Sequence, residues 1–187
     1  RERVAMEHPH LAHDFTEQRR LTLERALIPH GYTMAHVDAA YAEYFTARNE
    51  VECYADALPA LERLAARYPL VSLSNGNADL RRIGLDHFFR FSISARDCGV
   101  GKPDPAIFRA ACTGLNLPAD AVLHVGDDAQ LDVAGANAAG LKSAWLNRHD
   151  APWIGAAPPH IHVKSLHELA DRLLQAAAAP VVSRALA

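Results

Sequence analysis

The feature that most constrains the fold of this chain is a series of short apolar runs that begins after Val51. Each run is four or five residues long or shorter, is bounded by polar or turn-forming residues, and is typical of a buried strand. The predicted strands are Leu70–Ser74, Phe91–Ser94, Val122–Val125, Ser143–Leu146 and, more weakly, Ile161–Val163. Continuous apolar strands of this kind are typical of a parallel sheet that is buried on both faces.

Segments with helical spacing fill the gaps between these runs. The predicted helices of this part are Ala78–Ile83, Pro105–Leu115, Leu131–Ala139 and Leu166–Ala177. Strands that alternate with helices indicate an α/β protein in which helices cover both faces of the sheet. The sequence therefore predicts a doubly wound, Rossmann-like parallel sheet.

The first 50 residues have a different pattern. Apolar side chains recur at helical spacing in two segments, Asp14–Ile28 and Ala35–Arg48, and no strand pattern separates them. Asp14 is placed to cap the first helix, and Glu17 stands at the capping-box position three residues later. We therefore expect a small helical subdomain over residues 1–50 and an α/β core over residues 51–187.

Composition excludes several classes of protein. A formal net charge of −3 argues against a nucleic-acid partner, and no apolar run approaches the roughly 20 residues that a membrane span needs. No signal-peptide pattern opens the chain. The three cysteines, Cys53, Cys98 and Cys112, have no paired spacing, which favours reduced thiols in the cytoplasm. Nothing in the sequence indicates an oligomeric state.

Two of the predicted strands lead into segments that suit an anion. Ser74-Asn75-Gly76-Asn77 offers a hydroxyl and turn N–H groups to a phosphate oxygen, although an ordinary turn with Asn77 as a helix cap fits as well. Lys102 follows the next strand on a loop stiffened by prolines. Its ammonium group could neutralise a phosphate and an attacking carboxylate together, or it could be a solvated loop lysine.

Three acids follow the strand Val122–Val125. Gly126 lets the chain turn, Asp127 and Asp128 stand at the strand end, and Asp132 falls about one helical turn later. Magnesium is usually held by one or two carboxylates, with water and substrate phosphate completing its shell. Helix capping by Asp127 or Asp128 is the alternative, but it does not explain three acids behind one buried strand. The sequence therefore predicts Mg²⁺ as cofactor.

The order and spacing of these motifs resemble the haloacid-dehalogenase-like (HAD) hydrolase superfamily. On this resemblance Ser74 matches the phosphate-binding hydroxyl of the second motif, and Lys102 matches the lysine of the third. Asp127 matches the metal ligand of the fourth motif, Asp132 its accompanying acid, often without direct metal contact, and Asp128 stands at a variable position. The helices of residues 1–50 resemble the small cap of that superfamily.

The resemblance implies a magnesium-dependent phosphatase that acts through an aspartyl-phosphate intermediate. The dehalogenases of the superfamily share the motif at Ser74, but they typically have Ser-Asn in place of Gly126-Asp127 and use no metal. A carboxylate that attacks a phosphate dianion meets like-charge repulsion, which a cation relieves, whereas a carbon–halogen bond presents no such charge. Asp127 therefore favours a phosphatase; a 2-haloacid dehalogenase and a non-catalytic phosphate- or metal-binding module are the alternatives.

A narrower resemblance concerns substrate. The segments His13-Asp14-x-Thr16-x-x-Arg19, Ser74–Ala78 and Leu123–Asp128 together resemble a bacterial branch that dephosphorylates FMN and 5-amino-6-(5-phospho-D-ribitylamino)uracil. This implies a small phosphorylated metabolite, which the sequence does not narrow among flavin, nucleotide and sugar phosphates. His13, Arg19 and Arg48 could reach such a substrate, although surface or packing roles are favoured for each.

The nucleophile of the superfamily has no counterpart in this sequence. It is the first Asp of an Asp-x-Asp motif on the first core strand, whereas Asp38 and Asp56 lie in helical patterns. The chain begins at Arg1 without a methionine, so we expect the motif to lie upstream. The missing strand would lie between the strands that end at Ser74 and Val125. The chain alone is therefore expected to be inactive, poorly stable and a weak magnesium binder.

Overall fold

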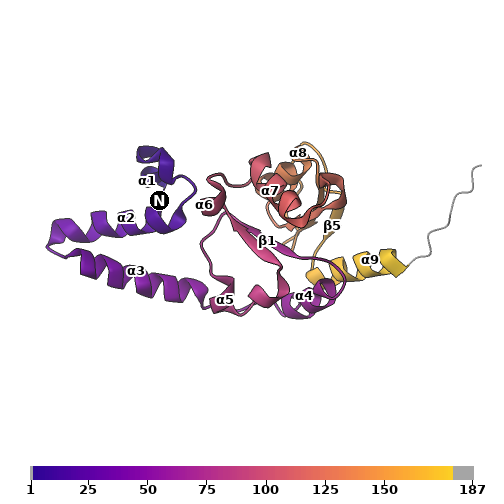
Figure 1. Ribbon diagram of the computed structural model, residues 1–187, viewed down its shortest axis with the longest axis horizontal. Helices are drawn as coiled ribbons and strands as arrows, with labels where there is room; N and C mark the ends of the chain where they lie inside the picture. The colour runs from indigo at the N-terminus through magenta and orange to yellow at the C-terminus, as the bar shows by residue number, and fades with distance from the viewer. Residues whose placement is uncertain (1, 179–187) are drawn as a thin grey trace, which may run out of the picture.

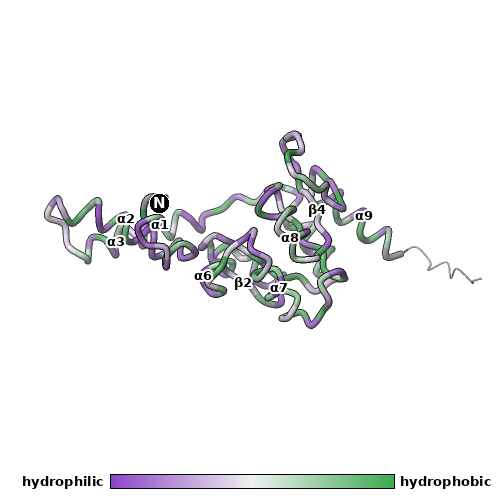
Figure 2. The backbone as a smooth tube through the Cα atoms, turned by 90° about the horizontal axis from the view of Figure 1, so that it is seen from above, coloured by the Kyte–Doolittle hydropathy of each residue, from purple (hydrophilic) through white to green (hydrophobic). Residues whose placement is uncertain are grey.

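A helical hairpin extends from one end of the molecule (Figure 1). The computed structural model describes residues 2–178. The helical elements of this end are α1 (Glu2–Glu7), η1 (Pro9–Leu11), α2 (Phe15–Leu27), η2 (Ile28–His30) and α3 (Met34–Asn49). Helices α2 and α3 agree with the predicted helices to within two residues at each end, while α1 and η1 were not predicted. Seen from above, the hairpin makes the molecule elongated (Figure 2).

Local signals in the sequence set the ends of the hairpin helices. The Asp14 carboxylate accepts a hydrogen bond of 3.0 Å from the backbone N–H of Glu17 and so caps α2, as predicted. Gly31 adopts a left-handed conformation (φ +85°) at the turn between α2 and α3. An ion pair between Arg20 and Asp38 then joins the two helices.

The described part of the core contains five strands. They are β1 (Val71–Ser74), β2 (Phe91–Ser94), β3 (Leu123–Gly126), β4 (Lys142–Leu146) and β5 (Ile161–Val163). Their bounds agree with the predicted strands to within one residue. All the pairings are parallel, and the described strands form two sheets of order β1-β2 and β3-β4-β5. The predicted α/β class with a parallel arrangement is therefore confirmed.

Helices cover both faces of these strands. The helical elements of the core are α4 (Ala57–Ala65), α5 (Leu80–Ile83), η3 (Asp86–Phe88), α6 (Ala95–Cys98), α7 (Pro105–Leu115), η4 (Ala119–Ala121), η5 (Ala129–Ala134), α8 (Gly135–Ala138) and α9 (Leu166–Ala178). Phe108 of α7 is fully buried in a cluster that includes Leu73 of β1 and Val122 beside β3. Leu169 of α9 packs against β3 and β4 in a second cluster.

One predicted helix has a different form. The segment predicted as a single helix over Leu131–Ala139 is a π-helical turn, η5, followed by the short helix α8. The turn starts earlier than predicted because the Asp128 carboxylate accepts hydrogen bonds of 2.8 Å from the backbone N–H groups of Gln130 and Leu131. The backbone N–H of Val133 also reaches back five residues to the Asp128 carbonyl.

The two sheets are separated by an apolar cavity. Among the described residues β1 pairs only with β2, and β3 pairs only with β4. A cavity of about 780 Å³ lies between their facing edges, and it is lined by Val71, Ser72 and Leu73 of β1 and by 123–126 of β3. The cavity therefore occupies the position at which the sequence predicts one more strand. Within residues 2–178 no helix is both long and apolar enough to span a bilayer.

Candidate functional site

The turn after β1 is closed by the hydroxyl group of Ser74. Its Oγ accepts a hydrogen bond of 2.9 Å from the backbone N–H of Gly76. Asn77 does not cap the next helix, because the cap of α5 is Asp79, which accepts a hydrogen bond of 2.9 Å from the backbone N–H of Arg81. The side-chain amide of Asn77 instead faces the helices of residues 2–49, which we call the cap. Its Nδ2 lies 3.4 Å from Thr16 Oγ1. The turn is therefore held by its own side chains at the border between cap and core.

Asn75 joins this turn to the lysine loop. Its Nδ2 donates a hydrogen bond of 2.8 Å to the carbonyl of Lys102, and its Oδ1 accepts one of 2.7 Å from the Lys102 N–H. A Cβ atom on Gly101 would lie only 2.9 Å from Asn75 Oδ1, so the close approach requires glycine. Asn75, which was predicted to bind phosphate, thus uses its side-chain amide to place Lys102.

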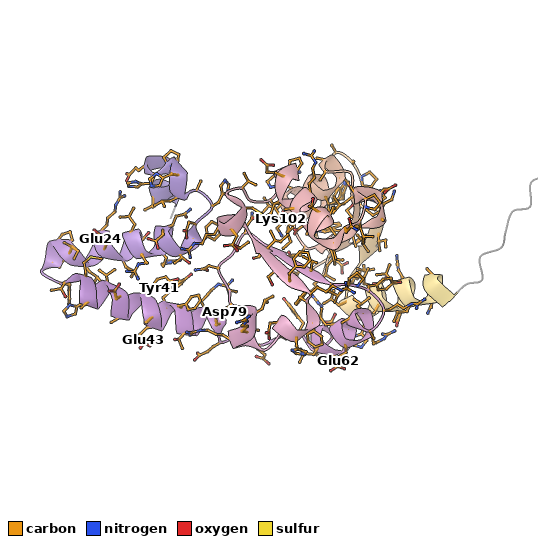
Figure 3. The ribbon with its side chains drawn as sticks, viewed as in Figure 1. Glu24, Tyr41, Glu43, Glu62, Asp79 and Lys102 are labelled. Atoms are coloured by element: carbon orange, nitrogen blue, oxygen red, sulfur yellow. The ribbon has the colours of Figure 1, made fainter. Side chains whose placement is uncertain are left out.

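Lys102, Asp132 and His124 form a buried charged cluster. Lys102 Nζ lies 2.6 Å from Asp132 Oδ1, and His124 Nε2 lies 2.8 Å from the same oxygen. The other carboxylate oxygen, Oδ2, accepts a hydrogen bond of 3.1 Å from the backbone N–H of Asp128. Only 3% of Asp132 is exposed. The third and fourth motifs therefore meet at one carboxylate, which holds Lys102. Figure 3 shows Lys102 on the loop between α6 and α7.

The surroundings of Asp132 favour its charged form. Burial by itself raises the pKa of the carboxyl, but the hydrogen bond from His124, together with the charge and hydrogen bond of Lys102, outweighs burial and lowers this pKa to about 2. Gly126 makes the arrangement possible. A Cβ atom there would lie 2.1 Å from Asp132 Cγ, so that any side chain would displace the acid.

The lowered pKa predicts a contribution of Asp132 to acid stability. Because the folded-state pKa lies below the reference value of 3.8, this contribution is present above pH 3.8 and is lost as the pH falls towards about 2. We expect the unfolding free energy to fall by roughly 2 kcal/mol more in the native protein than in an Asp132→Asn variant. Urea unfolding between pH 5 and pH 2 measures the difference. Equal losses in the two proteins would contradict it.

The adjacent acids Asp127 and Asp128 have different surroundings. The Asp128 carboxylate caps η5, which is the alternative that the sequence left open. Asp127 is exposed, and in the described part of the chain no hydrogen bond or ion pair engages its carboxylate. Only its backbone carbonyl is held, through a hydrogen bond of 2.9 Å from Trp145 Nε1. The strand end therefore presents a free carboxylate on a fixed backbone.

A hard cation could use this carboxylate. Residues 2–178 contain no group of three or more His, Cys, Asp or Glu side chains placed to hold a metal ion. Of the acids that follow β3, Asp127 has a free carboxylate among the described residues, while Asp132 already accepts three hydrogen bonds. Magnesium in proteins keeps several waters and often uses one or two carboxylates together with substrate phosphate, so the residues present fit a partly formed magnesium site.

The cap and the core enclose a second cavity, of about 650 Å³. It is lined by Ser74 and Gly76 from the turn after β1 and by Thr16, Tyr41 and Phe45 from the cap. Figure 3 shows Tyr41 between the two cap helices, where its hydroxyl lies 3.3 Å from Thr16 Oγ1. The cavity therefore begins at the predicted phosphate site and extends under aromatic residues of the cap.

The three residues of the cap that could reach a substrate, His13, Arg19 and Arg48, have different surroundings. His13 lines the second cavity. Arg19 stacks on the ring of Tyr44, with 4.5 Å between its guanidinium carbon and the ring centre, which fits a packing role. Arg48 reaches the turn after β1, since its Nη2 lies 3.6 Å from the position that a Cβ atom on Gly76 would take. Arg48 is thus the candidate that the structure brings to the phosphate turn.

His124 is a member of the Lys102–Asp132 cluster that the sequence prediction missed. It lies inside β3, two residues before Gly126, and its ring contacts Asp132 on one side and Phe108 on the other. The available signal was a polar side chain within an otherwise apolar strand. Because alternate residues of a strand share a face, that signal placed His124 on the side of Gly126 that faces η5.

The sequence matches known proteins along most of its length. A family model described as haloacid dehalogenase-like hydrolase matches residues 2–140. The chain is 30% identical over 177 residues to the 5-amino-6-(5-phospho-D-ribitylamino)uracil phosphatase YigB of Escherichia coli (strain K12), which covers 90% of this chain and 74% of that protein. It is 36% identical over 131 residues to (S)-2-haloacid dehalogenase 4A of Burkholderia cepacia, which covers 66% of this chain and 56% of that protein.

The fold has a close structural counterpart. The crystal structure of 2-haloacid dehalogenase from Pseudomonas syringae pv. Tomato DC3000 superposes with a TM-score of 0.87 at 34% identity, over 93% of this chain and 77% of that chain. A relative named as a phosphatase and relatives named as dehalogenases thus match this same chain. The resemblance predicted from the motifs is confirmed, and the chain belongs to the haloacid dehalogenase-like hydrolase family.

Proposed function

We propose that the protein is a magnesium-dependent phosphatase that hydrolyses a small phosphomonoester. The observation that carries this proposal is the exposed and unpaired carboxylate of Asp127, which follows the tight turn at Gly126. The hydrogen bonds between Asn75 and Lys102 and the contact of Lys102 with Asp132 bring the Ser74 turn to the same end of the sheets. A metal-binding acid beside two phosphate-binding groups suits a dianionic substrate.

Each side chain has a defined part in this reaction. The Ser74 hydroxyl and the N–H groups of its turn bind phosphate oxygens, and the Lys102 ammonium neutralises charge that builds up on the phosphoryl group. Asp127 holds the magnesium ion, while Asp132 fixes Lys102 and does not contact the substrate. When bound, magnesium supplies the positive charge that lets a carboxylate approach a phosphate dianion.

The nucleophile belongs to the strand that completes the sheet. The facing edges of β1 and β3 leave room for one extended segment, and a carboxylate at its end would lie between Ser74 and Asp127. We propose that a segment upstream of Arg1 provides this strand and an aspartate that attacks phosphorus in line. Water then hydrolyses the aspartyl phosphate that results.

The lining of the second cavity supports the proposal of a substrate that carries an aromatic ring. Tyr41 and Phe45 stack with their ring centres 5.9 Å apart and line a space of about 650 Å³ that begins at Ser74. This suits a ring system such as that of FMN or of a ribitylaminouracil phosphate, in line with the name of the Escherichia coli relative. We therefore propose a role in riboflavin or FMN metabolism. Free thiols at all three cysteines support the proposal of a cytoplasmic location.

The test is a substrate panel with the complete natural protein. FMN, the ribitylaminouracil phosphate, a sugar phosphate and a nucleotide are incubated with magnesium and, separately, with a chelator, and phosphate release is measured. We expect release only with magnesium and fastest from a substrate with an aromatic ring. No release from any ester would overturn the proposal.

A second candidate is a 2-haloacid dehalogenase, which the structural counterpart from Pseudomonas syringae favours. Halide release from 2-chloropropionate without magnesium would support it, and it would contradict the role of Asp127. If neither phosphate nor halide is released, the remaining alternative is a phosphate- or metal-binding module without catalysis.

The gap between the sheets predicts incomplete stability of the 187-residue chain. Among residues 2–178 no strand pairs with the facing edges of β1 and β3, so their backbone groups face an apolar cavity. We expect the isolated chain to unfold without a sharp transition, and the amides of β1 and β3 to exchange hydrogen faster than those of β4. Calorimetry and hydrogen exchange measure this. A sharp monomeric transition with protected β1 and β3 amides would contradict it.

A further inference from the structure

Arg48 and Ser74 border the same small space above Gly76. The position of a Cβ atom on Gly76 would lie 3.3 Å from Ser74 Oγ and 3.6 Å from Arg48 Nη2. A hydroxyl group from the core and a guanidinium group from the cap are thus both close to one point. That point belongs to the turn at which we propose the phosphate binds, so an oxyanion there could contact both groups.

The end of α3 is fixed at this turn by the residue next to Arg48. Asn49 is buried, its Oδ1 accepts a hydrogen bond of 2.7 Å from the backbone N–H of Asp79, and its Nδ2 donates one of 2.7 Å to the Phe45 carbonyl. Figure 3 shows Asp79 beside the end of α3. Arg48 is therefore carried on a backbone that is tied to Asp79, the cap of α5, which follows the proposed phosphate turn.

Arg48 also differs from the other arginines of the α2–α3 hairpin in its contacts. Arg19 stacks on Tyr44, Arg20 pairs with Asp38, and Arg25 pairs with Glu7. For Arg48 the described residues provide no ion pair and no ring partner. Its charge is therefore available to an anion.

The charge of Arg48 complements a deficit at the site. Lys102 is already paired with Asp132, and Asp127 adds a free negative charge to the same end of the sheets. For a phosphate dianion at Ser74, the core therefore provides Lys102, whose charge is balanced by Asp132, and Asp127, whose negative charge is not balanced. An arginine from the cap supplies positive charge that does not depend on the metal, and its planar fork matches the geometry of phosphate oxygens.

We propose that Arg48 donates hydrogen bonds to the phosphoryl group bound at Ser74, so that the cap contributes directly to the phosphate site and selects oxyanionic substrates. This inference rests on the proposed phosphatase function. The competing explanation is a purely structural one, in which Arg48 stabilises the carboxyl end of α3 through the helix dipole. Only the first explanation links Arg48 to the affinity for an anion.

The test compares Arg48→Gln and Arg48→Lys with Arg25→Gln in the complete natural protein. Arg25→Gln is the matched control because it removes the same charge from the same hairpin, away from the phosphate turn. The measurements are KM and kcat for the best phosphomonoester, the inhibition constant of inorganic phosphate, and the thermal melt. A hydrogen bond to a charged group is worth roughly a 10- to 100-fold change in affinity.

We expect Arg48→Gln to raise both KM and the inhibition constant of phosphate by roughly 10- to 100-fold, with kcat changed by less than about threefold. The two constants of Arg48→Lys should lie between those of the native protein and those of Arg48→Gln. Lysine keeps the positive charge but lacks the planar, two-pronged guanidinium group. Arg25→Gln should leave both constants unchanged. Unchanged constants in Arg48→Gln, or equal changes in Arg25→Gln, would overturn the inference.

Failure of the inference can be told apart from failure of the proposed function. If the native protein releases no phosphate from any ester, the proposed function fails, and calorimetric titration with inorganic phosphate then tests Arg48 alone. Phosphate binding that is lost in Arg48→Gln would support the role of Arg48. Binding that is absent in the native protein, or kept in the variant, would overturn it.

Discussion

Replacing Asp127 with asparagine should lower the proposed magnesium-dependent phosphate release by about 1,000-fold, the effect expected from removing one electrostatic contact to the transition state. The substitution keeps the size of the side chain and removes its negative charge. Because no described residue binds this carboxylate, no structural contact is lost and the thermal melt should be unchanged. Initial rates over a magnesium titration measure the effect, and higher magnesium should restore little activity.

Asp128→Asn is the matched control for this substitution. It removes the same charge from the neighbouring residue, and asparagine can still cap η5 through its side-chain oxygen. We expect the activity of Asp128→Asn to stay within about threefold of the native value, because asparagine and aspartate are equally good residues at a helix N-cap. An equal loss of activity in the two variants would mean that Asp128 also serves the metal, and retained activity in Asp127→Asn would contradict the phosphatase assignment.

Replacing Lys102 with methionine should lower the unfolding free energy by about 3 kcal/mol, the cost typical of leaving one member of a buried ion pair without its partner. The carboxylate of Asp132 would keep only His124 and the N–H of Asp128. The same substitution removes the ammonium group from the phosphate site, so activity should fall at least 100-fold. Denaturant unfolding and steady-state kinetics of the complete natural protein measure the two effects separately.

A double substitution separates the stability effect from the catalytic one. Lys102→Met combined with Asp132→Asn removes both charges of the pair, so the unfolding free energy should recover part of the loss. Activity should not recover, because the phosphate site still lacks its cation. A double variant that is no more stable than Lys102→Met would show that the cost does not arise from the unpaired carboxylate.

The strands and the longer helices could be predicted because short-range rules determine them. Buried strands are visible in the sequence as apolar runs. Asp14 caps the start of α2, and Pro105 favours the start of α7 through its restricted backbone. The site residues Ser74, Lys102 and Asp127 could be placed because parallel strands bring their carboxyl ends to one edge. Family membership followed from the order of these residues along the chain.

The remaining parts of the site depend on contacts between distant residues. The tie between Asn75 and Lys102, which are 27 positions apart, uses an amide that by sequence alone could equally face a ligand. His124 acquires its role only when η5 brings Asp132 back over β3. The approach of Arg48 to Gly76 likewise depends on how the cap sits against the core. No pattern of period or spacing contains such information.

The tight contact at Gly126 limits which single substitutions this position accepts. Dehalogenases of the family typically have Ser-Asn where this chain has Gly126-Asp127. A serine at position 126 would place its Cβ 2.1 Å from Asp132 Cγ, so Asp132 must move and release Lys102. A side chain at position 126 therefore requires a matching change in the η5 turn that carries Asp132.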